Sequence, residues 1–280
     1  MNDDITVVIA CHNYGAFLAE SVQSALAQEG GEPRVIVVDD GSTDAQTLAE
    51  LRRLPPRVEL LAQANAGAAE ARNAALRLVR TPYALALDAD DLLVPDALRR
   101  LRDPLDAEPA LGFSYGIMRF FGAWEGVVRM PAYDPYRLLF RHTIGVTALM
   151  RREMLQALGG YDPAFAGYED WELWLHALEH GWHGRRVEHV TLLYRRHGSS
   201  VHPDARRRYR ATFRRLRDKH AALYASASRR RLQAESDLGR AGQLVYRMWW
   251  GRRPLPARLE LALQSLLWRP RIGRPRRGRS

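Results

Sequence analysis

The chain of 280 residues has a single cysteine, Cys11, and no long apolar run. One cysteine excludes an internal disulfide and is compatible with a reducing compartment. No stretch approaches the ~18 consecutive apolar residues of a transmembrane helix. The N-terminus lacks the basic segment followed by an apolar segment that marks a signal peptide. From these absences we expect a protein that is made and kept in the cytoplasm.

Lysine is almost missing as well, since Lys219 is the only lysine among 42 basic residues. Arginine matches the geometry of phosphate and carboxylate groups, but a base-composition bias in the genome would produce the same preference. Such a bias does not explain where the charge lies. Residues 200–280 contain 22 basic and 5 acidic residues, whereas residues 1–199 contain 20 and 27. We therefore expect a mildly acidic body, residues 1–200, followed by a strongly basic extension, residues 201–280.

The first half of the chain alternates apolar runs with amphipathic stretches. The apolar runs predict strands at residues 5–10, 34–39, 58–62 and 83–87. Between and after them, helices are predicted at residues 17–28, 44–54 and 66–79 and from Pro95 onward. Strands that alternate with helices are typical of a parallel sheet with helices on both faces. A hydrophobic content of 46% over this length is enough for one large α/β core and additional structure.

The second half is less regular. It predicts strands at residues 112–121, 146–150 and 190–195 and helices at residues 151–158 and 168–181. Beyond Pro203 the sequence is helical and basic in character, with breaks near residues 226–228, 239–242 and 251–256. The tail from residue 268 is rich in arginine, proline and glycine, so we expect its end to be disordered.

An apolar strand ends abruptly in carboxylates at Asp88, Asp90 and Asp91. Open α/β sheets bind ligands at the carboxyl ends of their strands. Crowded carboxylates repel one another unless a cation is present, and Mg²⁺ or Mn²⁺, shared with a phosphate, suits oxygen ligands. The alternative is an acidic helix start in which Asp91 caps the helix from Pro95. This short run alone favours neither interpretation.

Polar groups also follow the first two predicted strands. His12 and Asn13 come after the first, and Asp39, Asp40 and Gly41 come after the second. A bound nucleotide needs an acceptor for the imide N–H of its base, a flat side chain over the ring and a close backbone approach. An aspartate, His12 and Gly41 are suitable for these tasks, although strand ends commonly turn with such residues.

Three further residues are candidates for the chemistry. Arg72, on the helix that follows Asn65 and Gly67, is placed to reach a phosphate, with a solvated helix surface as the alternative. Asp170 starts a helix among aromatic residues, and partial desolvation of a carboxylate suits a general base. Carboxylates at this end of a helix are also simply favoured by its dipole. His197, just after the last predicted strand, is a candidate for metal or phosphate, although a lone histidine is more often structural.

In their order, these elements resemble glycosyltransferase family 2, the nucleotide-sugar transferases with the GT-A fold. The resemblance runs from Ile5 to about Val201. It rests on the set VVIxxxNYGxFL, VVDDGSTD, NxGxxxARN, LDADD, GGYD, EDW and YRxH, which begin at residues 7, 37, 65, 87, 159, 169 and 194. Each motif alone occurs often by chance, but the complete set in this order is specific to the family.

The resemblance implies an α/β fold of the GT-A type, a Rossmann-like, mixed but mostly parallel sheet with helices on both faces, followed by a basic helical extension. It implies that Asp39 and Asp40 hold the nucleotide base. Asp88 and Asp90 match the Asp-x-Asp motif of the family, whose second carboxylate binds a divalent metal, Mn²⁺ or Mg²⁺.

The resemblance further implies that Asp170 is the catalytic base. His197 matches a histidine found near the metal and diphosphate in some members. Where relatives more often carry Thr-Tyr, this chain has Cys11-His12. An imidazole can still stack on a base, but the preference for one base becomes less certain. His12, Asn13, Arg72 and His197 complete the expected nucleotide-sugar site.

The implied reaction is inverting transfer from a nucleotide sugar, with UDP as the default nucleotide. The acceptor is a saccharide or lipid-linked hydroxyl, such as a precursor of a cell-surface polysaccharide. A metal-dependent nucleotidyltransferase, a catalytically inactive scaffold and a nucleic-acid-binding protein are the alternatives. The basic extension suggests the last of these, but it contains no recognisable nucleic-acid-reading motif, so no specific nucleic acid is expected.

The extension places tryptophans among arginines at residues 244–253 and adds an apolar stripe at residues 259–268. Basic amphipathic helices with tryptophan lie in the interface of anionic membranes. We therefore expect peripheral association with the inner face of the plasma membrane. The alternative is that these helices pack on the catalytic domain or on a second subunit.

Overall fold

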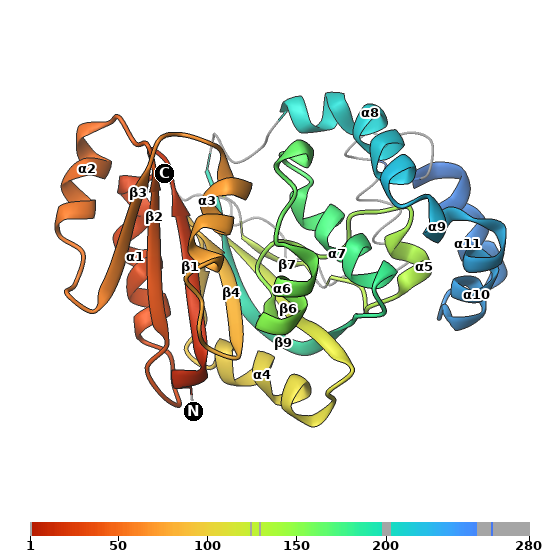
Figure 1. The fold of residues 1–280 in the computed structure, drawn as a ribbon, viewed down its shortest axis with the longest axis horizontal. Coiled ribbons are helices and arrows are strands. Elements are labelled where there is room, and N and C mark those ends of the chain that lie inside the picture. The colour runs from red at the N-terminus through yellow and green to blue at the C-terminus, as the bar shows by residue number, and fades with distance from the viewer. Residues whose placement is uncertain (1, 124, 129, 198–202, 251–258, 260–280) are drawn as a thin grey trace, which may run out of the picture.

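The computed structural model describes residues 2–123, 125–128, 130–197, 203–250 and 259. At its centre is a nine-stranded mixed sheet of order β3-β2-β1-β4-β8-β6-β9-β5, in which β7 pairs with β6. Helices cover both faces of this sheet (Figure 1). The predicted α/β class with a mixed sheet is confirmed.

The first half of the sheet is parallel. Its strands are β1 (Ile5–Cys11), β2 (Arg34–Asp40), β3 (Val58–Gln63) and β4 (Tyr83–Asp88), and its helices are α1 (Gly15–Leu26), α2 (Ala45–Arg52) and α3 (Ala68–Leu76). The predicted ranges agree with these bounds to within three residues. Along β2, Val35 and Val37 enter one core cluster while Ile36 and Val38 enter the other. Burial of both faces explains why the strand is continuously apolar.

The elements of the second half differ in length and direction, and their strands form both antiparallel and parallel pairs. They are β5 (Leu92–Leu93), α4 (Ala97–Ala107), β6 (Leu111–Gly122), β7 (Gly126–Val128), α5 (Pro135–Leu138), β8 (Leu149–Arg151), α6 (Arg152–Leu158), α7 (Glu169–Glu179) and β9 (His183–Arg196). Short 3₁₀ turns lie at Asn2–Asp4 and Pro163–Phe165. Strands β5 and β7 and helix α5 were not predicted, because two to four residues carry no periodic signal.

Two predictions in this half were wrong in extent or role. Strand β9 starts seven residues before the predicted Val190, because its first part is largely polar and partly exposed. The helix expected from Pro95 begins at Ala97 with Asp96 at the N-cap position. Asp91 is not its cap: this side chain is buried and accepts the backbone N–H of Arg195 at 2.8 Å.

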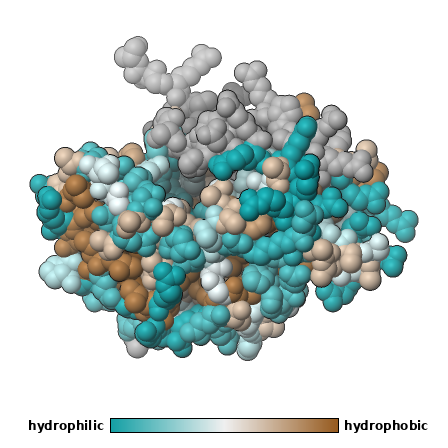
Figure 2. Space-filling model, turned by 45° about the horizontal axis from the view of Figure 1, so that its top comes forward, coloured by the Kyte–Doolittle hydropathy of each residue, from teal (hydrophilic) through white to brown (hydrophobic). Residues whose placement is uncertain are grey.

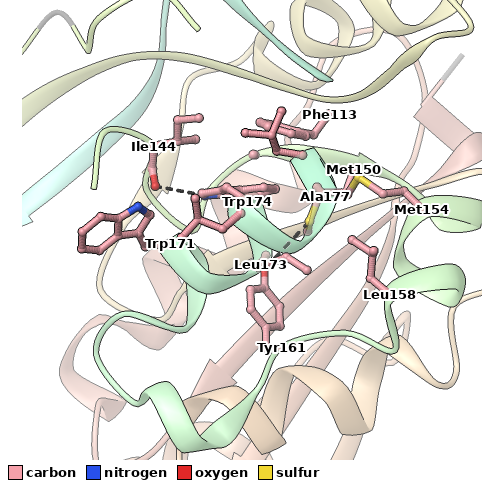
Figure 3. Close-up of a cluster of buried hydrophobic side chains, with 14 of the residues drawn as sticks. Phe113, Ile144, Met150, Met154, Leu158, Tyr161, Trp171, Leu173, Trp174 and Ala177 are labelled. Carbon is pink, nitrogen blue, oxygen red and sulfur yellow. Dashed lines mark hydrogen bonds between the residues drawn. The ribbon is translucent and has the colours of Figure 1, made fainter. Parts of the chain in front are cut away.

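Two apolar clusters enclose the sheet. One contains the inward faces of α1 and α4, and the other contains α6, α7 and much of the C-terminal region. Figure 3 shows part of the second cluster, where Trp174 lies among Phe113, Ile144 and Met150. The indole N–H of Trp174 donates to the Ile144 carbonyl at 3.1 Å. These contacts fix the helix α7 on which Asp170 lies.

The C-terminal extension is helical as predicted. It comprises α8 (Pro203–Lys219), α9 (Ala221–Tyr224), α10 (Ser226–Glu235), α11 (Arg240–Val245) and a π-helix, η3 (Tyr246–Trp250). Five apolar side chains of the extension are buried in the same cluster as α7: Phe213, Leu216, Leu223, Leu232 and Tyr246. These side chains pack the described helices of the extension on the preceding part of the chain. Of the residues considered for membrane contact, Tyr246 is buried in this cluster.

The helix breaks predicted near residues 226–228 and 239–242 lie slightly earlier, at Ala225 and at residues 236–239. Further predictions for the extension lie outside the described residues. They concern the break at residues 251–256, the disordered tail, and the apolar stripe at residues 259–268, apart from the backbone and exposure of Leu259. Within the described part of the chain, no helix is long and apolar enough to span a membrane. Figure 2 shows a mainly hydrophilic surface, with hydrophobic residues gathered on the side formed by the first half of the chain.

Candidate active site

The loops that follow β1, β2 and β4 meet at one edge of the sheet. The three strands are neighbours and parallel, and their pairing places Cys11 beside Asp39 and Ala10 beside Asp88. Their carboxyl ends therefore lie together, as expected for a ligand site of an open α/β sheet. The polar residues predicted from the strand ends are brought into one region.

Asp40 organises the loop that follows β3. Its buried carboxylate accepts three hydrogen bonds of 2.8 Å, from Gln63 Nε2 and from the backbone N–H groups of Ala66 and Gly67. The neighbouring Gly41 has φ +69°, and a Cβ there would lie 2.7 Å from the Asn65 nitrogen. Glycine thus permits both the turn and the close approach. In this arrangement Asp40 supports the loop and its carboxylate faces backbone donors.

Asp39 and His12 lie more openly at the same edge. Asp39 is partly exposed and accepts the Ser42 N–H at 2.9 Å. His12 has its Nδ1 atom 2.9 Å from the Asp40 carbonyl oxygen and 3.0 Å from Asn65 Nδ2. The imidazole is therefore held in place beside Asp39, which suits a pair that contacts a base.

Asn13 orders the loop after β2. Its side-chain oxygen accepts the N–H groups of Thr43 and Asp44 at 2.8 and 3.1 Å, and its own φ is +59°. Asparagine tolerates this left-handed conformation better than most residues. The Asn13 side chain thus holds the loop beside Asp39 through hydrogen bonds to the backbone of that loop.

The acidic turn after β4 brings Asp88, Asp90 and Asp91 together. One ligand oxygen from each lies within 4.8 Å of the others. Burial raises the pKa of Asp90 and Asp88 raises it further, against the lowering effect of His197. Burial, followed by the charge of Asp88, raises the pKa of Asp91 to about 9. Partly buried carboxylates that repel one another are stabilised by a hard cation, so these residues fit Mn²⁺ or Mg²⁺.

His197 and Arg195, from the end of β9, complete this turn. The Nε2 atom of His197 lies 2.9 Å from Asp90 Oδ2, and its ring packs against Phe17 with centroids 5.1 Å apart. Arg195 donates through Nε to the Asp90 carbonyl at 2.8 Å, in addition to its backbone bond to Asp91. The structure therefore brings His197 to the acidic turn, whereas the supporting role of Arg195 was not predicted.

Arg72 is neither a solvated surface residue nor directed at open space. It is buried and bridges Asp88 Oδ1 at 2.7 Å and Glu169 Oε1 at 2.9 Å. Burial alone would lower its pKa, but the two carboxylates raise it, so the guanidinium stays charged. The alternative of a solvated helix surface is therefore wrong, while the role of Arg72 toward a phosphate stays a prediction. Arg72 links the acidic turn to the residue that precedes Asp170.

Asp170 lies at the start of α7 in an aromatic environment. Its Oδ1 atom accepts the Trp171 N–H at 2.8 Å, and its Oδ2 atom lies 2.8 Å from Nε2 of His142. Trp171 in turn stacks on Tyr209 and Phe213 of α8, with centroids 6.0 and 5.9 Å apart. Trp171 is thus an aromatic neighbour of Asp170 as expected, whereas the two rings of the extension that stack on it were not predicted.

Sequence reasoning missed His142 and Glu169 as members of this region. Glu169 was part of a quoted motif without a role of its own. His142 stands in an irregular segment with no motif around it, so no signal in one sequence singles it out. It lies near Asp170 only because the chain folds back between α5 and β8.

A second connection joins the helix α3 to the segment before α7. Asn73 Nδ2 donates to the Tyr161 carbonyl at 2.7 Å, and its oxygen accepts the Tyr161 N–H at 2.8 Å. A Cβ on Gly160, whose φ is +86°, would lie 2.5 Å from Asn73 Oδ1. The ARN and GGYD motifs are thus parts of one contact.

Comparisons with known proteins agree with this geometry. A family model described as glycosyl transferase family 2 matches residues 6–169. The chain is 43% identical over 109 residues to the succinoglycan biosynthesis protein ExoO of Rhizobium meliloti, covering 38% of this chain and 31% of that protein. It is 35% identical over 113 residues to a chondroitin synthase of Escherichia coli, covering 40% of this chain and 16% of the synthase. The chain thus spans at most a third of these two relatives.

Solved structures show the same fold at low sequence identity. S. aureus TarS 1–349 in complex with UDP-GlcNAc matches with a TM-score of 0.61 and 18% identity, over 86% of this chain and 70% of that one. Mannosyltransferase PcManGT from Pyrobaculum calidifontis, in complex with GDP-Man and Mn²⁺, matches with a TM-score of 0.56 and 21% identity. That match covers 96% of this chain and 81% of the mannosyltransferase.

Proposed function

The chain belongs to glycosyl transferase family 2, and we propose that it moves a sugar from a UDP-sugar to a hydroxyl of a saccharide or lipid-linked acceptor, with inversion at the anomeric carbon. The observation that carries this proposal is the buried bridge from Asp88 through Arg72 to Glu169. It joins the acidic turn to the segment bearing Asp170, which supports a donor site and a base that are linked by one buried contact.

The donor side of the proposed site consists of the acidic turn and the loops after β1 and β2. Asp90 is the proposed metal ligand, oriented by His197, with Asp88 beside it. A bound divalent metal supplies positive charge that stabilises the departing diphosphate. Asp39 is the proposed hydrogen-bond acceptor for the nucleotide base, and His12 is the proposed side chain that stacks on the ring of that base. Asp40 and Asn13 hold the surrounding loops.

Asp170 is the proposed catalytic base. The acceptor oxygen forms a bond to the anomeric carbon while the bond from that carbon to the diphosphate oxygen breaks. The electron pair leaves with the diphosphate, and Asp170 takes the proton of the acceptor hydroxyl. The position of Asp170, near Glu169 and the Arg72 bridge but outside the acidic turn, agrees with a base on the acceptor side.

A thermal-shift screen tests the donor. We expect a UDP-sugar to raise the melting temperature by about 5 to 10 °C at a concentration 100-fold above Kd, and only with Mn²⁺ present. Asp90→Asn should abolish this shift. If only GDP-sugars or only dTDP-sugars raise the melting temperature, the donor nucleotide is that one and not UDP. The absence of any shift with all three, with and without metal, would contradict the donor site.

A second proposal concerns where in the cell the protein acts. On α11 and the residues after it, Leu244 and Met248 are 48% and 55% exposed, beside the exposed Arg240 and Arg247. A hollow of about 590 Å³ next to them is lined by both arginines. We propose that this surface contacts an anionic membrane that carries a lipid-linked acceptor. Apolar side chains flanked by arginines are typical of such contacts.

Vesicle flotation tests this contact without requiring activity. Deleting the chain from residue 240 would also remove the buried Tyr246, so substitution is the better probe. Leu244→Ser with Met248→Ser should reduce binding to phosphatidylglycerol vesicles, whereas Leu60→Ser, with 48% exposure on β3, should not. An unchanged bound fraction in the double variant would rule out this surface as the membrane contact.

A further inference from the structure

His142 holds one side of the Asp170 carboxylate. Its Nε2 atom lies 2.8 Å from Asp170 Oδ2, while the backbone N–H of Trp171 occupies Oδ1 at 2.8 Å. Each carboxylate oxygen thus has one partner within the protein, and these two partners come from different segments. Together they fix the plane of the carboxylate, which neither contact alone can do.

The imidazole is itself fixed by aromatic contacts. Its ring stacks on Trp171, with centroids 6.2 Å apart and an angle of 18° between planes, and meets the edge of Tyr168 at 6.1 Å. Trp171 is fully buried and donates its indole N–H to the Leu138 carbonyl at 2.8 Å. The histidine therefore lies on a rigid platform built from α7 and the segment after α5.

The surrounding charges favour a donating imidazole. Burial would lower the pKa of His142, but the charge of Asp170 and the hydrogen bond to it raise that pKa above its ordinary value, with smaller contributions from the Ile144 carbonyl and Glu169. Arg72, by contrast, pairs with Asp88 and Glu169. Among the described residues, His142 is thus the side chain seen to ion-pair with Asp170.

Exposure separates the two partners. The His142 side chain is 31% exposed, whereas that of Asp170 is 12% exposed. The imidazole is therefore the more solvent-exposed of the two groups, and the carboxylate is the more enclosed one. A shift of about 1 Å in a reacting group can cost roughly 100-fold in rate, so the orientation of this carboxylate is a property that catalysis depends on.

We propose that His142 is a positioning residue that orients Asp170 toward the acceptor hydroxyl. This inference rests on the proposed role of Asp170 as the base. During transfer the hydroxyl proton moves to Asp170, while the Nε2–H of His142 stays with the imidazole and keeps its hydrogen bond. Among the described residues, His142 is seen to contact Asp170, Trp171 and Tyr168 and none of the donor side. We therefore expect its effect to fall on turnover and not on donor binding.

Two substitutions separate the hydrogen bond from the ring. His142→Phe keeps the stack on Trp171 and removes the donor, and we expect kcat to fall about 10- to 100-fold with the donor KM within about twofold of wild type. His142→Gln keeps an N–H donor at a similar reach and should recover kcat to within about threefold of wild type. His189→Gln, on the exposed part of β9, is the matched control and should change neither constant.

The outcomes are distinct. A wild-type kcat in His142→Phe, or a His142→Gln variant no better than His142→Phe, would overturn the positioning role. If His142→Phe does not fold, His142→Asn replaces it, because its shorter amide leaves Asp170 out of reach. The kcat of His142→Asn is then compared with that of His142→Gln, and equal values would overturn the positioning role.

A double variant distinguishes this inference from the assignment of the base. If Asp170→Asn lowers kcat strongly and His142→Phe causes no further loss from the residual rate of that variant, the two residues act as a unit. If Asp170→Asn retains wild-type turnover, the proposed base is wrong. If Asp170→Asn is inactive while His142→Phe is fully active, only the positioning role fails.

Discussion

The two sides of the proposed site are built by different means. The donor side consists of loops at neighbouring strand ends, and its contacts are mostly hydrogen bonds between carboxylates and backbone N–H groups, as at Asp40. The base side consists of stacked aromatic rings from α7, α8 and the segment around His142. Local turns determine the first, whereas the second requires packing between segments far apart in the chain. Changes on the two sides should therefore have separable effects.

The largest expected effect is on turnover alone. Asp170→Asn removes the proposed base and should lower kcat by about 10²- to 10⁴-fold, because general-base catalysis contributes on that order. The Mn²⁺-dependent thermal shift with a donor sugar should stay as in wild type, since the donor side is untouched. Parallel loss of donor binding and turnover would show that the two sides are not separable and would contradict the assignment.

Arg72→Gln should damage both sides at once. It leaves Asp88 and Glu169 without the guanidinium that pairs them, and breaking a buried pair costs about 3–5 kcal/mol of unfolding free energy. Urea unfolding measures this loss. Arg77→Gln, an exposed residue just after the same helix, is the control and should stay within about 0.5 kcal/mol. If the two variants are equally stable, the ion pairs of Arg72 with Asp88 and Glu169 do not hold the donor side and the base side together.

Leu216→Ala tests whether the extension belongs to the base side. This side chain on α8 is fully buried in the cluster that contains α7, so its truncation should cost about 3 kcal/mol. Transfer should weaken more than donor binding because α8 supports Trp171. Arg214→Ala, exposed on the same helix, should be nearly neutral. An unaffected unfolding midpoint for Leu216→Ala would separate the extension from the catalytic body.

The smallest effect concerns pH. Burial would raise the pKa of Glu172, but hydrogen bonds from His220 and Lys219 outweigh it and lower that pKa. A lowered pKa in the folded state stabilises the protein above the ordinary value of about 4.3. The contribution is lost as pH falls through the folded-state value. We expect the stability difference between wild type and Glu172→Gln to shrink below about pH 4 in urea titrations. A difference that is constant from pH 7 to pH 3 would contradict the linkage.

The same contrast explains what could be predicted from the sequence. Strands β1 to β4 were predicted because burial on both faces leaves a continuous apolar signal, and the loops after them carry contiguous motifs. Arg72 was singled out, but its partners were not, because Glu169 is 97 residues away and no pattern encodes that contact. His142 and the stacking of Tyr209 on Trp171 depend on tertiary packing alone.

The division of the chain at residue 200 also shows what the sequence could and could not predict. The change in charge suggested a separate extension, and we still propose a catalytic domain over residues 1–200 with a basic extension after it. Charge reports the exposed face of a helix, however, and not the buried one. Phe213 and Leu216 lie on the hidden face of an arginine-rich helix, so the composition gave little sign that α8 completes the core.

The ties between the acidic turn and β9 also bear on how the protein is made. Asp91 and Asp90 are held by Arg195 and His197, which lie 104 to 107 residues later in the chain. A polypeptide still emerging from the ribosome presents these carboxylates long before the strand that restrains them is synthesised. The parallel strands β1 to β4 can form early, but the turn reaches its final shape only after β9 is added. Translation itself thus delays the appearance of a competent donor site until most of the chain exists.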